Sequence, residues 1–390
     1  MEATSPFALH IVWHPNYNIG IEVANRIFEH FGAKHDQRLA GDTGVRVVYR
    51  KAVAPGSQTP LPIDWQSGNV TAAVILADNE LASDPAWTEY AREIAREADM
   101  KGFSAGIFPV VMESGVLDNI DLTEQALRWD RWNGEYRERE QRLLRDLTYE
   151  FIRMLRYYLT QLRHPNEDVA DLGSYLRNVQ VFLSHSKHDD QGESIAREVR
   201  DWLHHNSALA SFLDIQDIPA GLPFREVLLH QIENSIIVVV YTNSYSSREW
   251  CRREVIEAKK QQVPMIVFDC LRGIDPRSIP YMGNVPFVRM DSDQGDRIGT
   301  VIGCLLDEVF WTYIWFCSVE RFRTQHPDIL FMARPPELIA LATLPDHQNE
   351  ADSTIVYPDP PLGTDEAQLF LKVAPNVRTH TLSKWMEELQ

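Results

Sequence analysis

The sequence predicts an α/β protein with two doubly wound parallel sheets in tandem, followed by a small α/β segment. Short apolar runs rich in β-branched residues alternate with amphipathic helical patterns, which is typical of βαβ units. This alternation occurs twice along the chain, and the loops between its elements are short. Together these observations favour parallel sheets that are covered by helices on both faces.

The second half of the chain carries the clearest alternation. Residues 179–184 form a short apolar run that predicts a buried strand, and residues 234–241 contain five consecutive Ile and Val residues, which favours a central strand. A helix is predicted after that strand, at residues 248–260. The other predicted elements are helices at residues 193–204 and 224–232 and strands at residues 211–215, 264–269 and 285–288.

Composition limits the functions that the chain can have. Of its 390 residues, 44% are hydrophobic and 24% are charged, as in folded proteins. The net charge of −18, without a basic cluster, disfavours direct nucleic-acid binding. The four cysteines lie far apart and no histidine has metal-ligand spacing, so we expect a reducing compartment and no metal site. The first nine residues do not have the pattern of a signal peptide, so we expect a cytoplasmic protein.

Residues 301–319 form an apolar stretch about as long as a membrane span. Asp307 and Glu308 lie at its middle, where burying two carboxylates in lipid would cost much free energy. We therefore expect a buried helix or one face of an oligomer, and no membrane span.

Three motifs in the second half resemble those of Toll/interleukin-1 receptor (TIR) domains. VFLSHSKHDD at residues 181–190 resembles their first conserved box, DIPAG at residues 217–221 resembles their BB loop, and SYSSREWCRRE at residues 244–254 resembles the helix with their WCxxE element. The resemblance covers residues 179–290. It implies a flavodoxin-like sheet that self-associates and that, in many members, hydrolyses or cyclises NAD⁺.

The resemblance implies that the Glu of WCxxE, here Glu254, is catalytic. Nicotinamide leaves as a neutral molecule, so no general acid is needed, and one carboxylate beside the ribose can stabilise the positive charge that develops there. Trp250 lies one helical turn earlier, so both side chains can line a cleft at the carboxyl ends of the strands. Without the motif, Glu254 would be a surface carboxylate whose replacement changes stability little.

Four more pocket residues are carried over from the resemblance. His185 and Ser186 follow the first strand of the domain, at positions that border the pocket in TIR enzymes. We expect His185 to be a polar loop residue and not a base, because no substrate proton has to be removed first. Phe224 could stack on a flat base, and Gly221 could give the BB loop the freedom to admit substrate. No cofactor is expected, because NAD⁺ is the substrate.

The first half resembles the second. Residues 9–14 parallel the first box, and VAPG at residues 53–56 parallels IPAG in the BB loop. Trp87 opens a predicted helix as Trp250 does, but Ala91 stands where the Glu would be. We interpret the first half as a degenerate TIR-like copy without the carboxylate, which serves as a docking surface, a ligand sensor or a structural partner.

These patterns divide the chain into four parts. We predict a degenerate TIR-like domain at residues 1–163, whose last helix begins at residue 142, and a linker at residues 164–177. A TIR domain at residues 178–325 includes a helix from residue 297, and a small α/β extension follows at residues 326–390. Because the extension is too small to fold alone, we expect it to dock on the TIR domain.

The favoured hypothesis is a TIR-domain NAD⁺ nucleosidase, either a glycohydrolase or a cyclase. The resemblance suggests a bacterial immune or anti-phage effector that is activated by self-association and by an unknown partner. The alternative is a non-catalytic adaptor that acts through protein contacts. A nucleoside deoxyribosyltransferase-like enzyme would want a Tyr and paired acids near the first loop, and we do not find them there.

Overall fold

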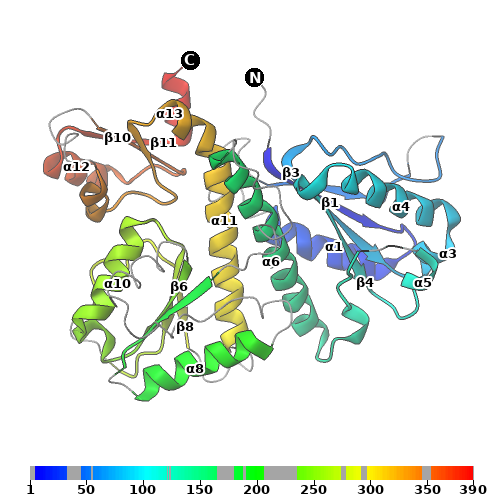
Figure 1. The fold of residues 1–390 in the computed structure, drawn as a ribbon, viewed down its shortest axis with the longest axis horizontal. Helices are drawn as coiled ribbons and strands as arrows, with labels where there is room; N and C mark the ends of the chain where they lie inside the picture. The colour runs from blue at the N-terminus through cyan, green and yellow to red at the C-terminus, as the bar shows by residue number, and fades with distance from the viewer. Residues whose placement is uncertain are drawn as a thin grey trace. The chain divides into compact units, whose positions relative to one another are not determined.

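The computed structural model describes residues 5–32, 45–53, 56–120, 122, 124–164, 180–187, 190–205, 235–273, 278–290, 297–344 and 353–389. The chain divides into two compact units. The first unit comprises Met1–Tyr175 and Tyr313–Glu320, and the second comprises Leu176–Thr312 and Arg321–Gln390. Parallel sheets form the centre of both units, as the sequence predicts (Figure 1).

The first unit contains a four-stranded parallel sheet in the order β2-β1-β3-β4. The chain moves outward from β1 to β2 and then returns across β1 to β3, so the winding direction reverses between β1 and β3. The central strands are almost wholly buried and apolar. The strands are β1 (Ser5–Trp13), β2 (Val45–Arg50), β3 (Gly68–Ala77) and β4 (Ala105–Val111). Strand β1 therefore starts four residues before the segment 9–14 that parallels the first box, and ends one residue before that segment does.

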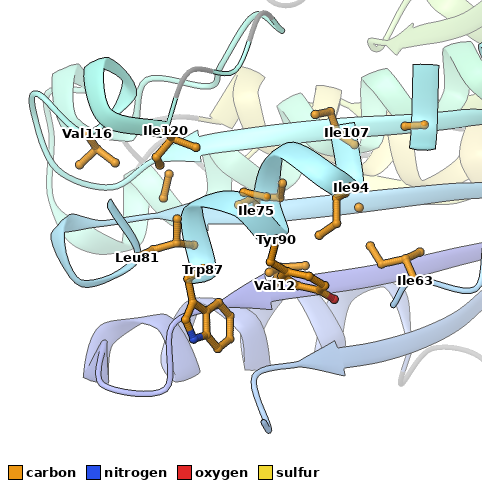
Figure 2. Packing of buried hydrophobic residues seen from close by; sticks show 14 residues of the cluster. Val12, Ile63, Ile75, Leu81, Trp87, Tyr90, Ile94, Ile107, Val116 and Ile120 are labelled. Carbon is orange, nitrogen blue, oxygen red and sulfur yellow. The ribbon is translucent and has the colours of Figure 1, made fainter. Parts of the chain in front are cut away.

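Helices cover both faces of this sheet. Helix α4 (Pro85–Asp99) packs Trp87 and Ile94 into the apolar core that Figure 2 shows. On the other face, the Phe151 ring of α6 (Tyr136–Arg163) lies 5.1 Å from that of Phe31 in α1 (Asn18–Phe31). Two short helices, α3 (Asn79–Ser83) and α5 (Leu117–Ile120), complete this unit together with 3₁₀ turns at Gly102–Ser104 and Trp129–Arg131.

Helix α6 starts six residues before the predicted position. Its first turn is almost entirely polar, so apolar periodicity does not reveal it. A capping box at Glu135 and Glu138 satisfies the amides at its start.

The second unit contains a four-stranded parallel sheet in the order β5-β6-β7-β8. Residues 236–240 of β6 are at most 2% exposed, which confirms that this strand is central. The strands are β5 (Gln180–Ser184), β6 (Ser235–Tyr241), β7 (Met265–Asp269) and β8 (Phe287–Arg289). The strand predicted at residues 211–215 and the helix predicted at residues 224–232 lie outside the described residues.

In the described part of the second unit the helices are α8 (Asp190–His205), α10 (Glu249–Lys260) and α11 (Arg297–Gln325), although Tyr313–Glu320 of α11 belong to the first unit. Helix α10 packs Cys251, Val255 and Ala258 against one face of the sheet. Helix α11 is long and apolar enough to cross a membrane, but 67% of its apolar window is buried inside the structure. A mostly buried core helix has the same composition, so this helix is weak evidence for a membrane span.

The C-terminal extension forms a parallel sheet in the order β11-β10-β9, which belongs to the second unit. Its strands are β9 (Ile329–Phe331), β10 (Ser353–Tyr357) and β11 (Val377–Thr381), with helices α12 (Thr364–Val373) and α13 (Leu382–Glu388) and a 3₁₀ segment at Leu338–Thr343. The extension docks beside the C-terminal end of α10, where Lys259 pairs with Glu337 at 2.7 Å. Strand β9 is not predicted from the sequence, because three residues after a long helix give no readable alternation.

Candidate functional site

The candidate site lies where β5 ends and α10 begins. Ser184 is the last residue of β5, and its hydroxyl donates a hydrogen bond to Glu254 Oε2 of α10. The Tyr245 hydroxyl, in the 3₁₀ turn Tyr245–Ser247 between β6 and α10, lies 2.5 Å from Ser184 Oγ. Strand β5, the 3₁₀ turn and helix α10 thus bring three polar side chains together in the interior.

Glu254 is buried, with 7% of its surface exposed. This corrects the view of Glu254 as a surface carboxylate whose replacement would change stability little. On α10 it shares the buried face with Cys251, Val255 and Ala258, at offsets of three, one and four residues. The same spacing is readable in the sequence, and it places Glu254 on the core face even though charged neighbours surround it along the chain.

Burial raises the pKa of the Glu254 carboxyl from 4.5 to about 7. Three groups oppose this effect by favouring the ionised form: the Ser184 hydroxyl, the charge of Lys187 and a hydrogen bond from Trp250. No Lys, Arg or His forms a salt bridge with Glu254 among the described residues. The carboxyl therefore titrates near neutral pH and is held by hydrogen-bond donors in place of a paired cation.

Trp250 lies where the sequence analysis placed it, one turn before Glu254 and within hydrogen-bonding reach of that carboxyl. Its half-buried ring packs against the core between α10 and the sheet. The Arg253 guanidinium lies 6.0 Å from the centre of the ring. Trp250 thus borders the carboxyl on one side and solvent on the other.

His185 and Ser186 directly follow β5. The His185 carbonyl accepts a hydrogen bond from the Cys251 thiol at 3.6 Å, so this loop is tied to the first turn of α10. Burial lowers the pKa of the His185 ring, which favours the neutral imidazole. Ser186 is 1% exposed. The structure therefore brings His185 close to α10 and buries Ser186, whereas Phe224 and Gly221 lie outside the described residues.

Two members of the cluster, Ser184 and Tyr245, are not predicted as site residues from the sequence. Both stand inside quoted motifs, Ser184 in VFLSH and Tyr245 in SYSSREW. Their pairing joins positions 61 residues apart, so no local pattern could reveal it. In the part of the chain that the structure describes, no group of three His, Cys, Asp or Glu residues could hold a metal ion.

Comparison with known families identifies this region. Residues 181–300 match the family model described as TIR domain. A search of curated proteins found no match to the chain. The matched residues begin in β5, contain α10 with Glu254, and end in the first turn of α11. The chain therefore contains a TIR domain at residues 181–300, and the buried carboxylate cluster lies within it.

Proposed function

We propose that this TIR domain is an NAD⁺ glycohydrolase, or a cyclase if a group of the same ADP-ribose attacks C1′ in place of water, and that Glu254 is its catalytic carboxylate. A TIR domain supports signalling or NAD⁺ hydrolysis in general. The observation that favours hydrolysis is the state of Glu254, which is buried, held by hydroxyl and indole donors, and raised in pKa to about 7.

A purely structural role does not account for this carboxyl well. Burying an ionisable group without a cationic partner costs stability, and packing alone would be served better by an apolar side chain. Glu254 lies at the carboxyl end of β5, where parallel sheets bind ligands. Strongly perturbed carboxyls at such positions are concentrated in functional sites.

The proposed reaction needs only this carboxylate and a water molecule. The bond between ribose C1′ and the nicotinamide nitrogen breaks, and its electron pair stays on the nitrogen, which becomes neutral. Ionised Glu254 stabilises the positive charge that develops on the ribose, and the low polarity around it strengthens that interaction. A water oxygen then bonds to C1′, and its proton passes to Glu254, whose pKa near 7 suits a base.

The test is nicotinamide release from NAD⁺ by the purified full chain, at low and high protein concentration. We expect Glu254→Gln to lower the rate by about a hundredfold or more, because the stabilising charge is lost. Glu249→Gln is the matched control, since Glu249 is exposed on the same helix and pairs with Arg253. If wild type is active and Glu254→Gln is equally active, the assignment is wrong.

The adaptor alternative predicts a different pattern. The wild-type chain would then release no nicotinamide at any concentration, and Glu254→Gln would leave its self-association unchanged. We also propose that the enzyme acts in the cytoplasm, on the ground of its widely spaced cysteines. Activation by self-association and by an unknown partner is proposed from the family resemblance.

We also propose that the first unit is a degenerate TIR-like copy. Both sheets continue in the same direction: β4, the strand beside β3, bridges in parallel from Val110 to Leu127, and β7, the strand beside β6, pairs in parallel with β8. The amide that follows each of these strands bonds back to the preceding strand at 2.9 Å, Met112 to Ala77 and Cys270 to Tyr241. If the two sheets and their helices superimpose in a crystal structure, the proposal is supported. A different order of helices in the two units would contradict it.

A further inference from the structure

We propose that Tyr245 and Ser184 are positioning residues for Glu254, forming a buried chain of hydroxyl donors that ends on Glu254 Oε2. This inference rests on the proposed function for its role in the reaction. Its structural part concerns only the direction of two hydrogen bonds and can be tested without substrate.

The geometry determines which way each proton points. Ser184 Oγ lies within hydrogen-bonding distance of both the Tyr245 hydroxyl and Glu254 Oε2. A serine hydroxyl has one proton, and an ionised carboxylate can only accept. When Glu254 is ionised, Ser184 therefore donates to Glu254 and accepts from Tyr245. The chain runs from Tyr245 O–H to Ser184 O–H to Glu254 Oε2.

Tyr245 is well suited to the head of this chain. It is fully buried, and burial together with the charge of Glu254 raises the pKa of its phenol well above the ordinary value. The phenol therefore keeps its proton at every pH at which the protein works. Its ring is held by an edge contact with Tyr241, with ring centres 5.7 Å apart. A fixed donor at the head prevents Ser184 from turning its proton away from Glu254.

The chain counteracts the effect of burial on Glu254. Of the groups that favour its ionised form, the Ser184 hydrogen bond has the largest effect, followed by the Lys187 charge and then Trp250. Lys187 is exposed, so water and salt screen its charge. The other titratable neighbours, Tyr245 and Cys251, are neutral because burial raises the pKa of both. The buried hydroxyls are therefore the main interior support for the negative charge.

This arrangement gives the two carboxyl oxygens different roles. Ser184 holds Oε2, so the proton that Glu254 takes from the attacking water is carried by Oε1. The water oxygen forms its bond to C1′, the O–H electron pair remains on that oxygen, and the proton leaves Oε1 for solvent after the product departs. The balance requires NAD⁺ and water only.

The test compares four variants of the full chain. Tyr245→Phe removes one buried hydroxyl, Ser184→Ala removes the link, and Ser184→Thr keeps a hydroxyl at the same position. Tyr241→Phe is the matched control, because Tyr241 is a neighbouring buried tyrosine that is not one of the three residues Tyr245, Ser184 and Glu254. The carboxyl of Glu254 is titrated by infrared difference spectroscopy against Glu254→Gln, and kcat for nicotinamide release is measured against pH.

We expect Ser184→Ala to raise the infrared pKa of Glu254 by about one unit, which is a tenfold change in its ionisation equilibrium. Tyr245→Phe should raise it in the same direction by less, because Ser184 can still donate. The acidic limb of the kcat profile should move by the same amounts. Ser184→Thr should restore both values, and Tyr241→Phe should change neither.

Failure of this inference is distinguishable from failure of the proposed function. Suppose that Glu254→Gln abolishes NAD⁺ hydrolysis while Tyr245→Phe and Ser184→Ala leave the infrared pKa of Glu254 unchanged. The proposed chain of hydroxyl donors is then wrong, and the proposed NAD⁺ hydrolysis is supported. If the infrared pKa of Glu254 moves as expected but wild type does not hydrolyse NAD⁺, the chain of hydroxyl donors is supported and its proposed role in hydrolysis is wrong. Thermal melts identify any variant that fails to fold, and Tyr245→Phe, which changes one atom, is then decisive.

Discussion

The two four-stranded parallel sheets differ in the side chains at the end of one strand and on one covering helix. In the first unit, the last residue of β1 is Trp13, which is 1% exposed, and Ala91 on α4 is fully buried. In the second unit, β5 ends in Ser184 and α10 carries Glu254 in a buried position. At these two positions the first unit has apolar side chains, whereas the second has a hydroxyl and a carboxyl. Fold and packing therefore do not require the carboxyl, which favours a functional reason for it.

The first unit does place one carboxyl at the end of a central strand, but that carboxyl has a structural role. Asp78 follows β3, and its Oδ1 accepts a hydrogen bond from the Leu81 amide at 2.8 Å. It thereby caps the short helix α3. Glu254 caps no helix and instead receives side-chain donors from other elements.

The largest effect on stability should come from introducing a carboxyl into the first unit at position 91, which corresponds to Glu254 in the second. Ala91→Glu buries a charge in a core cluster whose side chains are apolar except for the Tyr90 hydroxyl, which already donates to the Leu61 carbonyl. We expect it to destabilise the first unit by about 3 to 5 kcal/mol. Hydrogen exchange across α4, followed by mass spectrometry, measures this change within one unit.

Ala91→Gln separates charge from size, because Gln has nearly the shape of Glu and carries no charge. We expect Ala91→Gln to destabilise the unit less, since no ion is buried. Equal exchange rates for wild type and Ala91→Glu would contradict the comparison, because they would show that the first core tolerates a carboxyl as the second does.

The next largest effect should be the pH dependence of the second unit. The folded pKa of Glu254, about 7, lies above its ordinary 4.5, so between these values the folded protein binds a proton that the unfolded chain releases. Stability therefore falls as pH rises from 4.5 to 7 and stays lower above. Glu254→Gln cannot ionise, so above pH 7 it should be about 3 kcal/mol more stable than wild type.

Denaturant unfolding at pH 8 and at pH 4.5 checks this prediction. The two proteins should differ at pH 8 and agree closely at pH 4.5, where Glu254 is protonated in wild type. A wild-type protein more stable than the variant at pH 8 would show that the ionised carboxyl stabilises the fold, contrary to the functional interpretation.

Much of this comparison could be predicted from the sequence, because it depends on local patterns. The run of Ile and Val in β6 and the stripe of apolar residues on α10 predict a central strand and its covering helix. The contrast between Glu254 and Ala91 could be found from spacing alone. The link from Glu254 through Ser184 to Tyr245 could not, since it depends on contacts across 61 to 70 residues.

The smallest effect should come from the starts of the two corresponding helices. Asp84 caps α4 by accepting hydrogen bonds from the amides of Ala86 and Trp87, whereas Arg248, at the same place before α10, forms no side-chain cap in the described structure. Asp84→Ala should destabilise the first unit by about 1 kcal/mol, because two amides lose their acceptor. Arg248→Ala should change the start of α10 by less than about 0.5 kcal/mol.

Hydrogen exchange of the first turns of α4 and α10 measures both changes. Pro85 at the start of α4 fixes the backbone independently of the cap, so the helix should persist in Asp84→Ala and only its first turn should exchange faster. Faster exchange along the whole of α4 would mean that the cap supports the core as well as the helix end. Faster exchange in α10 after Arg248→Ala would show that Arg248 stabilises the start of this helix through a contact other than a cap. Arg248 would then be a further candidate for a residue that positions Glu254.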